Sequence, residues 1–290
     1  MIRKNYQRGV LLAVIAMLGA CGMFGKDKVQ LDGERVAVLK ESKMLAPDFE
    51  PNQIKINLPK PYTNKQWSQE GGNSRHVMGH LTADSKLKKM WDSGFGEGNS
   101  KRDYLLAAPV IAHQVVFTID ADAKVRAFRL DDGDEIWSKR VKPLNKDERS
   151  VSMKGAGLAY FDKKIYATTG FGSVFALDMK TGRPIWRFDN SAPIRIAPTA
   201  ANGKIFVQTI DNTLICLDAY NGSELWRYKT ATENTTLVGG ASPAYSPEQD
   251  VVIAAFSSGE LRAIKASTGS SLWGDLLISR RRTNSLASIN

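Results

Sequence analysis

The stretch VVFTIDADAKVRAFRLDDGDEIW, residues 115–137, decides the fold of this 290-residue chain. It contains short apolar runs separated by turn residues, and it ends with a glycine four positions before a tryptophan. The same ending occurs four times, as Gly133/Trp137, Gly182/Trp186, Gly222/Trp226 and Gly269/Trp273. The tryptophans are 49, 40 and 47 residues apart. A period of this size indicates a stacked unit that is built from several short strands.

The four units agree in detail when they are aligned on their tryptophans. Apolar residues stand twelve, ten and nine positions before each Trp, and in the first unit they are Val125, Ala127 and Phe128. The glycine follows Asp, Thr or Asn and accepts the positive φ that a tight hairpin needs. An apolar, mostly β-branched run lies further upstream in each unit, at 115–119, 164–169, 204–210 and 251–256. With one more short run before it, each unit has about four strands.

These units predict an all-β chain, namely a β-propeller whose radial four-stranded sheets each cover the face of the next sheet. We expect the blades at about residues 105–140, 155–188, 195–229 and 240–274, within a propeller region at 87–290. The repeated glycines and tryptophans are structural in this interpretation. Each Trp is expected to fill space against the adjacent sheet, where a large ring buries much apolar area.

The N-terminus has the order of a bacterial secretion signal. A positive segment at residues 3–8 precedes an apolar run at 10–18, which is short for a transmembrane helix. The run ends in Leu-Gly-Ala-Cys, which resembles a lipobox, so we expect residues 1–20 to be removed and Cys21 to be lipidated. An ordinary signal peptide with an incidental cysteine is the alternative. Gly22 in place of Asp favours the outer membrane.

Residues 21–86 lack a helix-length apolar period and are rich in proline and charge, which is typical of an extended tether or partly ordered arm. Within this arm, NKQWSQEGGNSRH at 64–76 looks like a segment that packs onto the propeller through Trp67. The histidines of the arm lack companions at metal-ligand spacing, so no metal site is expected. The segment LKKMW at 87–91 has the pattern of a lone strand, which a ring needs to complete its last blade.

Charge and cysteine usage exclude some classes of function. The formal net charge is +10, but the basic residues are scattered and no nucleic-acid motif accompanies them. We therefore expect a solvated basic surface and no nucleic-acid partner. Cys216 stands where the other units have alanine, and it is expected to be a small buried hydrophobe. No disulfide between Cys216 and Cys21 is expected, because Cys21 is expected to carry the lipid.

The repeat pattern A-(L)-(D)-x-x-T-G-x-x-(L/I)-W resembles that of quinoprotein-type propellers. In the order lipobox, tether, lone strand and Trp-ended repeats, the chain resembles the BamB family of outer-membrane assembly lipoproteins from about residue 87 onward. The closest local matches are at 107–137 and 272–290, and the long arm looks like that of alphaproteobacterial members. The resemblance implies an eight-bladed ring without catalytic activity. Four blades are present before Asn290, so the sequence looks truncated.

The resemblance also implies a partner and a location. It implies a scaffold on the periplasmic face of the outer membrane that binds the POTRA domains of BamA and works with other barrel-assembly subunits. The family's partner-binding loop follows the third repeat Trp and pairs a leucine with an arginine. The matching residues here are Thr235, Thr236, Leu237 and Val238, so valine stands where the arginine would be. The alternative is that Leu237 simply begins the next strand. No cofactor and no small-molecule substrate are implied.

Two other functions stay open at this level. A quinone-dependent dehydrogenase shares the repeat, but the chain has no adjacent cysteine pair, nucleophile elbow, phosphate loop or metal-ligand spacing. Its aspartates, such as Asp120 and Asp178, stand at strand ends and turns, where Asp bonds the backbone. A generic periplasmic propeller lipoprotein or adaptor is the other possibility. Capture of BamA distinguishes it from the scaffold.

Overall fold

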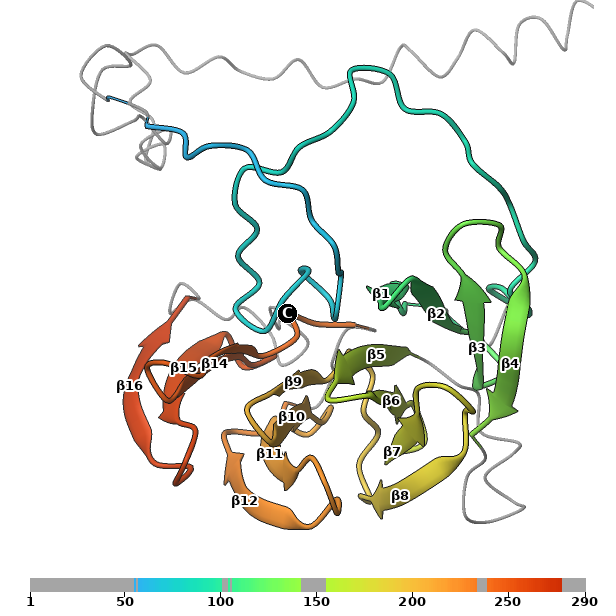
Figure 1. The fold of residues 1–290 in the computed structure, drawn as a ribbon. Helices are drawn as coiled ribbons and strands as arrows, with labels where there is room; N and C mark the ends of the chain where they lie inside the picture. The colour runs from blue at the N-terminus through green and yellow to red at the C-terminus, as the bar shows by residue number, and fades with distance from the viewer. Residues whose placement is uncertain are drawn as a thin grey trace, which may run out of the picture. The chain divides into compact units, whose positions relative to one another are not determined.

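The computed structural model describes residues 55, 57–100, 104, 106–141, 155–233 and 239–277. The chain divides into two units, residues 1–57 and 58–290, and all of the described strands belong to the second. Four antiparallel four-stranded sheets follow one another along the chain, which confirms the predicted all-β propeller architecture (Figure 1). Among the described residues, no helix has the length and apolar character needed to span a bilayer.

Each sheet is an up-and-down meander and is called a blade here. Blade 1 consists of β1 (Val110–Ala112), β2 (Val115–Ile119), β3 (Lys124–Arg129) and β4 (Glu135–Arg140). Blade 2 consists of β5 (Ala156–Phe161), β6 (Lys164–Thr169), β7 (Ser173–Asp178) and β8 (Pro184–Asp189). Blade 3 consists of β9 (Thr199–Ala201), β10 (Lys204–Gln208), β11 (Thr213–Asp218) and β12 (Glu224–Lys229). Blade 4 consists of β13 (Ala244–Ser246), β14 (Val251–Ala255), β15 (Glu260–Lys265) and β16 (Ser271–Leu276).

The third and fourth strands of every blade pair in the same way. The small residue ten positions before each Trp is the direct cross-strand partner of that Trp, as in Ala127↔Trp137 and Cys216↔Trp226. Directly after this small residue, the register shifts in all four blades. In each blade the residue directly before the Trp has no cross-strand partner, as Ile136 has none in blade 1, and such a β-bulge locally bends and twists a strand pair. The repeat in the sequence is therefore a repeat of backbone geometry.

The hydrophobic core lies between successive blades. One cluster joins Phe117 and Val125 of blade 1 to Leu158 and Phe175 of blade 2. A second cluster joins blades 2 and 3, and a third joins blades 3 and 4. In such an arrangement each repeat is stabilised mainly by its neighbours in the sequence.

The strand predicted at residues 87–91 is wrong, because the structure has no strand there. Leu87 and Met90 are 89% and 78% exposed. A strand needs an adjacent backbone to satisfy its N–H and C=O groups, and the described residues offer this segment no paired strand. Trp91 at the end of the segment nevertheless occupies a specific position on blade 1.

Candidate interaction surface

At each contact between two successive blades, the repeated tryptophan of one blade packs on the hairpin glycine of the next blade. These three contacts are called the inner contacts. Trp137 covers Gly182, and Trp186 covers Gly222, so that a Cβ added at either glycine would lie 2.5 Å from the ring carbon Cε3. Trp226 covers Gly269 in the same way. The indole N–H groups donate to backbone carbonyls at 2.9, 3.0 and 2.9 Å; the acceptors are Met179, Ala219 and Ala266. The structure thus places the repeated Gly–Trp residues at the contacts between blades.

The two ends of this series differ from the inner contacts. Trp273 is 49% exposed, because no further blade covers it among the described residues. At the other end Gly133 is covered by Trp91, whose Cε3 would lie 2.5 Å from an added Cβ. The Trp91 indole N–H donates to the Leu130 carbonyl at 2.8 Å. Trp91 therefore makes the contact that the last strand of a preceding blade makes elsewhere.

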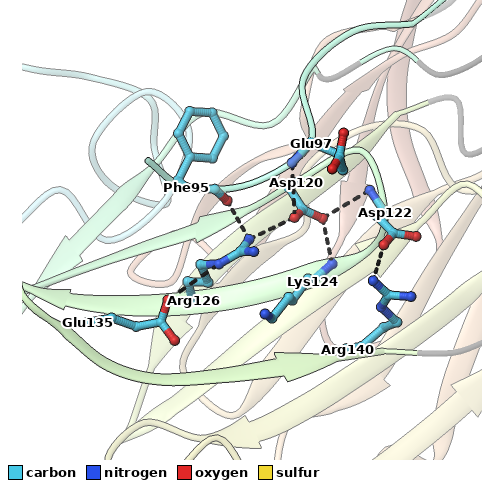
Figure 2. A network of polar contacts seen from close by, with 8 residues as sticks. All are labelled: Phe95, Glu97, Asp120, Asp122, Lys124, Arg126, Glu135 and Arg140. Atoms are coloured by element: carbon cyan, nitrogen blue, oxygen red, sulfur yellow. Dashed lines mark hydrogen bonds and ion pairs between the residues drawn. The ribbon is translucent and has the colours of Figure 1, made fainter. Parts of the chain in front are cut away.

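A polar network joins residues 95–97, which follow the arm in the sequence, to blade 1 (Figure 2). Asp120 is 1% exposed and accepts backbone N–H groups from Glu97, Asp122 and Lys124 at 3.3, 2.9 and 2.8 Å. The guanidinium of Arg126 lies 2.7 Å from the same carboxylate. A carboxylate has about four acceptor positions, and these four donors fill them. Asp120 is thus committed to structure, as is expected for an aspartate at a turn.

Arg126 is held on three sides. It donates to the Phe95 carbonyl, pairs with the buried aspartate, and lies 3.5 Å from the Glu135 carboxylate. Phe175 and Ile215 occupy the same repeat position in blades 2 and 3, where they belong to the clusters that face the preceding blade. Blade 1 therefore presents a charged residue at a position that is apolar in blades 2 and 3, and the Phe95 carbonyl together with Asp120 and Glu135 satisfies this charge.

The predicted partner-binding residues Thr235, Thr236, Leu237 and Val238 lie outside the described residues, and so does the predicted lipidation site Cys21. The structure describes the start of the loop that carries residues 235–238, and it shows which hydrogen bonds fix this start. The Asn212 carbonyl accepts the Thr230 N–H at 3.0 Å, and the Asn212 amide donates to the Ala231 carbonyl at 2.6 Å. The Asn212 side-chain oxygen accepts the N–H and the hydroxyl of Ser257 in blade 4 at 3.1 and 2.8 Å. One buried asparagine thus joins blade 3, blade 4 and the loop between them.

A cavity of about 40 Å³ lies where this loop enters blade 4. Its lining includes Arg195, Gln208 and Gly239–Ala241. Burial lowers the pKa of Arg195, and its Nε has no hydrogen-bond partner among the described residues. Ligand cavities are typically about 300–1,000 Å³, so this one suits a few water molecules rather than a substrate. The cavity therefore has polar side chains at its edge and lies beside the loop between blades 3 and 4.

The other displaced pKa values are dispersed over the fold. Burial raises the pKa of the Cys216 thiol to about 12. Burial also lowers the pKa of His76 in the arm, and the nearby Glu70 carboxylate partly opposes this shift. Catalytic sites usually gather such groups in one cleft. Within the described ranges, no three His, Cys, Asp or Glu side chains lie together so that they could hold a metal ion.

Comparison with known proteins decides the family. The profile of the family described as outer membrane protein assembly factor BamB matches residues 121–290. The chain belongs to the BamB family. An uncharacterized protein of Rickettsia prowazekii is 30% identical over 170 residues, which are 58% of this chain and 40% of that protein. The outer membrane protein assembly factor BamB of Shewanella oneidensis is 24% identical over 187 residues, which are 63% and 47% of the two chains. The family resemblance seen in the repeats is confirmed, and the chain spans about half the length of the curated relatives it matches.

Solved structures share the fold. BamB from Moraxella catarrhalis matches with a TM-score of 0.51 and 19% identity, over 59% of this chain and 48% of that chain. A quinohemoprotein alcohol dehydrogenase from Pseudomonas putida HK5 matches with a TM-score of 0.58 and 19% identity, over 74% and 40% of the two chains. At this identity both matches show the propeller fold alone. They do not distinguish a scaffold from a dehydrogenase.

Proposed function

We propose that this BamB-family chain is a non-enzymatic scaffold of the machinery that inserts β-barrels into the outer membrane. The family match over residues 121–290 is the observation that carries the proposal. In this proposal the lipid on Cys21 anchors the chain at the periplasmic face of the outer membrane, and the propeller docks the POTRA domains of BamA. The expected eight-bladed ring is part of the same proposal, with Trp91 in the position of a closing contact.

The loop between blades 3 and 4 is the docking element in this proposal. Binding residues are often found on loops that a rigid scaffold positions. Asn212 fixes the start of the loop to both neighbouring blades, so the loop projects from a defined place. Leu237 supplies an apolar anchor for the contact. Arg195 lines the adjoining cavity together with Gly239 and Gly240, and it supplies a guanidinium beside the described end of the loop. Arginine is enriched among residues that dominate binding energy.

Co-purification with BamA tests the proposal. Leu237→Asp in the full chain is expected to abolish co-purification, because a charge then replaces the apolar anchor. Leu225→Asp is the matched control: Leu225 lies on the outer strand β12, is 49% exposed, and is expected to tolerate the same change. Retained capture by Leu237→Asp excludes this loop as the docking element. Failure of the unmodified chain to capture BamA excludes the function.

The fold likeness to a quinohemoprotein alcohol dehydrogenase makes a quinone-dependent dehydrogenase the second candidate. The displaced pKa values are dispersed over the fold, and within the described ranges no three His, Cys, Asp or Glu side chains lie together to hold a metal ion, so we rank this candidate second. Dye reduction with pyrroloquinoline quinone, calcium and a primary alcohol decides the matter. We expect no turnover above the protein-free rate.

A further inference from the structure

The first strand of every blade donates a backbone N–H to one short segment of the arm. The segment, residues 67–74, is called the clasp here. The donors are Ile111 in β1, Tyr160 in β5, Ala200 in β9 and Tyr245 in β13, and the acceptors are Trp67 O, Ser68 O, Gln69 Oε1 and Ser74 O. The four distances are 2.7, 2.6, 2.8 and 2.6 Å. Each first strand is an edge of its sheet, so the clasp satisfies backbone groups that the sheets leave unpaired.

At blades 1 and 2 the clasp adds to the sheet edges in antiparallel fashion. Trp67 and Ile111 exchange both backbone hydrogen bonds, and Gln69 forms an antiparallel bridge with Ala159. This is the geometry by which an extended peptide adds to an exposed strand. The arm segment expected to pack on the propeller therefore does so, and it uses the backbone of Trp67.

At blade 3 a side chain takes over the role of the backbone. Gln69 is 3% exposed, its Oε1 accepts the Ala200 N–H at 2.8 Å, and its Nε2 donates to the Ala200 carbonyl at 3.3 Å. The amide thus pairs with Ala200 as a neighbouring strand would. At blade 4 the Ser242 hydroxyl donates to the Glu70 carboxylate at 2.7 Å.

A glycine turn gives the clasp its shape. Gly71 and Gly72 have φ angles of +70° and +88°, a region that side chains rarely adopt. The Gly72 N–H donates to the Gln69 carbonyl at 2.9 Å, and the Ser68 N–H donates to the Gly72 carbonyl at 3.1 Å. A Cβ at position 72 would lie 2.2 Å from the sulfur of Met78. The turn therefore sets the positions of the contacts on either side of it.

We propose that the first-strand edges of the four blades form one peptide-binding site whose ligand is the chain's own clasp, residues 67–74, and that the clasp makes the blades open as one unit. The hydrophobic clusters join only successive blades, so they provide no shared core for blades 1 and 4. In a stack of repeats, nearest-neighbour contacts alone allow the ends to open separately. The clasp contacts both end blades directly, and it also shields edge strands that otherwise invite pairing with other chains.

Native-state hydrogen exchange on the full chain tests this proposal. In the unmodified chain the amides of Ile111, Tyr160, Ala200 and Tyr245 are expected to share one free energy of opening, so that their exchange is slowed by the same factor relative to each intrinsic rate. Gln69→Ala leaves the buried Ala200 groups unpaired, and it is expected to speed exchange of all four amides by roughly tenfold. Gln66→Ala is the matched control, since residue 66 lies in the exposed stretch just before the clasp. It is expected to leave all four rates unchanged.

The distant amides decide the outcome. Faster exchange of Ala200 alone, with Ile111 and Tyr245 unchanged in Gln69→Ala, shows a merely local contact and overturns the proposal. Gly72→Ala disturbs the same clasp by straining its turn and removes no contacting group. It must produce the same acceleration at Ile111 and Tyr245, and unchanged rates at these two amides also overturn the proposal.

Discussion

Removing the ring of Trp186 is expected to weaken the contact between blades 2 and 3 more than any loss at an end of the series. The ring lies over Gly222, its N–H donates to the Ala219 carbonyl at 3.0 Å, and its centroid is 5.7 Å from that of the buried Tyr166. A fully buried aromatic side chain removes about 150–250 Å² from water, which corresponds to about 4–6 kcal/mol at about 25 cal/mol per Å² and is an upper bound for the partly buried Trp186. Residual structure in the unfolded chain lowers such figures. We therefore expect Trp186→Ala to cost about 3–5 kcal/mol, in the range measured for large-to-small aromatic substitutions.

Trp273→Ala is the matched control, because Trp273 holds the same repeat position but is 49% exposed. With about half of the ring already in water, its loss is expected to cost about 1–2 kcal/mol. Urea denaturation of both variants, followed by circular dichroism, gives the two changes in the free energy of unfolding. Equal losses in the two variants refute the idea that the tryptophans act by covering the next blade.

Three further outcomes are expected. Gly222→Ala should lower the free energy of unfolding more than Gly203→Ala does. Both glycines have positive φ, but only at Gly222 would the added Cβ lie 2.5 Å from the Trp186 ring. Equal losses of stability in urea denaturation indicate that backbone strain alone is responsible. Burial holds the pKa of His76 below its ordinary value, so the unfolded chain binds the proton first and stability falls as the pH drops below 6.5. The melting temperature should therefore fall more between about pH 7.5 and about pH 5.5 in the unmodified chain than in His76→Gln, and parallel profiles contradict this. Cys216 is fully buried with a pKa raised to about 12, so it should react with a thiol reagent only after denaturation. Rapid labelling of Cys216 in the native chain, assigned by peptide mass spectrometry, contradicts its burial.

The repeat units were predictable because their signals are local. The apolar runs at 115–119 and 164–169 coincide with β2 and β6. The run at 204–210 ends as a strand at Gln208, because the Thr209 hydroxyl accepts the Thr213 N–H at 3.2 Å and turns the chain. Threonine ends strands in this way because its hydroxyl forms hydrogen bonds with nearby backbone groups, and the pattern of apolar residues in the sequence does not show such bonds.

The contacts of the arm were not predictable in the same way. Gln69 forms hydrogen bonds with the backbone of Ala200, which is 131 residues away in the sequence. A single polar side chain forms no repeating pattern, so the sequence does not indicate its partner. At 87–91 the apolar pattern predicts a strand, but a strand also requires a neighbour, and pattern alone does not supply one. The expected functional residues Cys21 and 235–238 lie outside the described residues, so both stay predictions.

Direct binding of purified BamA POTRA domains to the full chain tests whether this propeller is a docking scaffold. The measurement is a titration monitored by the change in tryptophan fluorescence or by calorimetry, with Leu237→Asp and Leu225→Asp as the paired variants. Saturable binding is expected for the unmodified chain and for Leu225→Asp, and loss of binding is expected for Leu237→Asp. A folded, unmodified chain that shows no binding to the POTRA domains contradicts the assignment of this propeller as a docking scaffold for BamA.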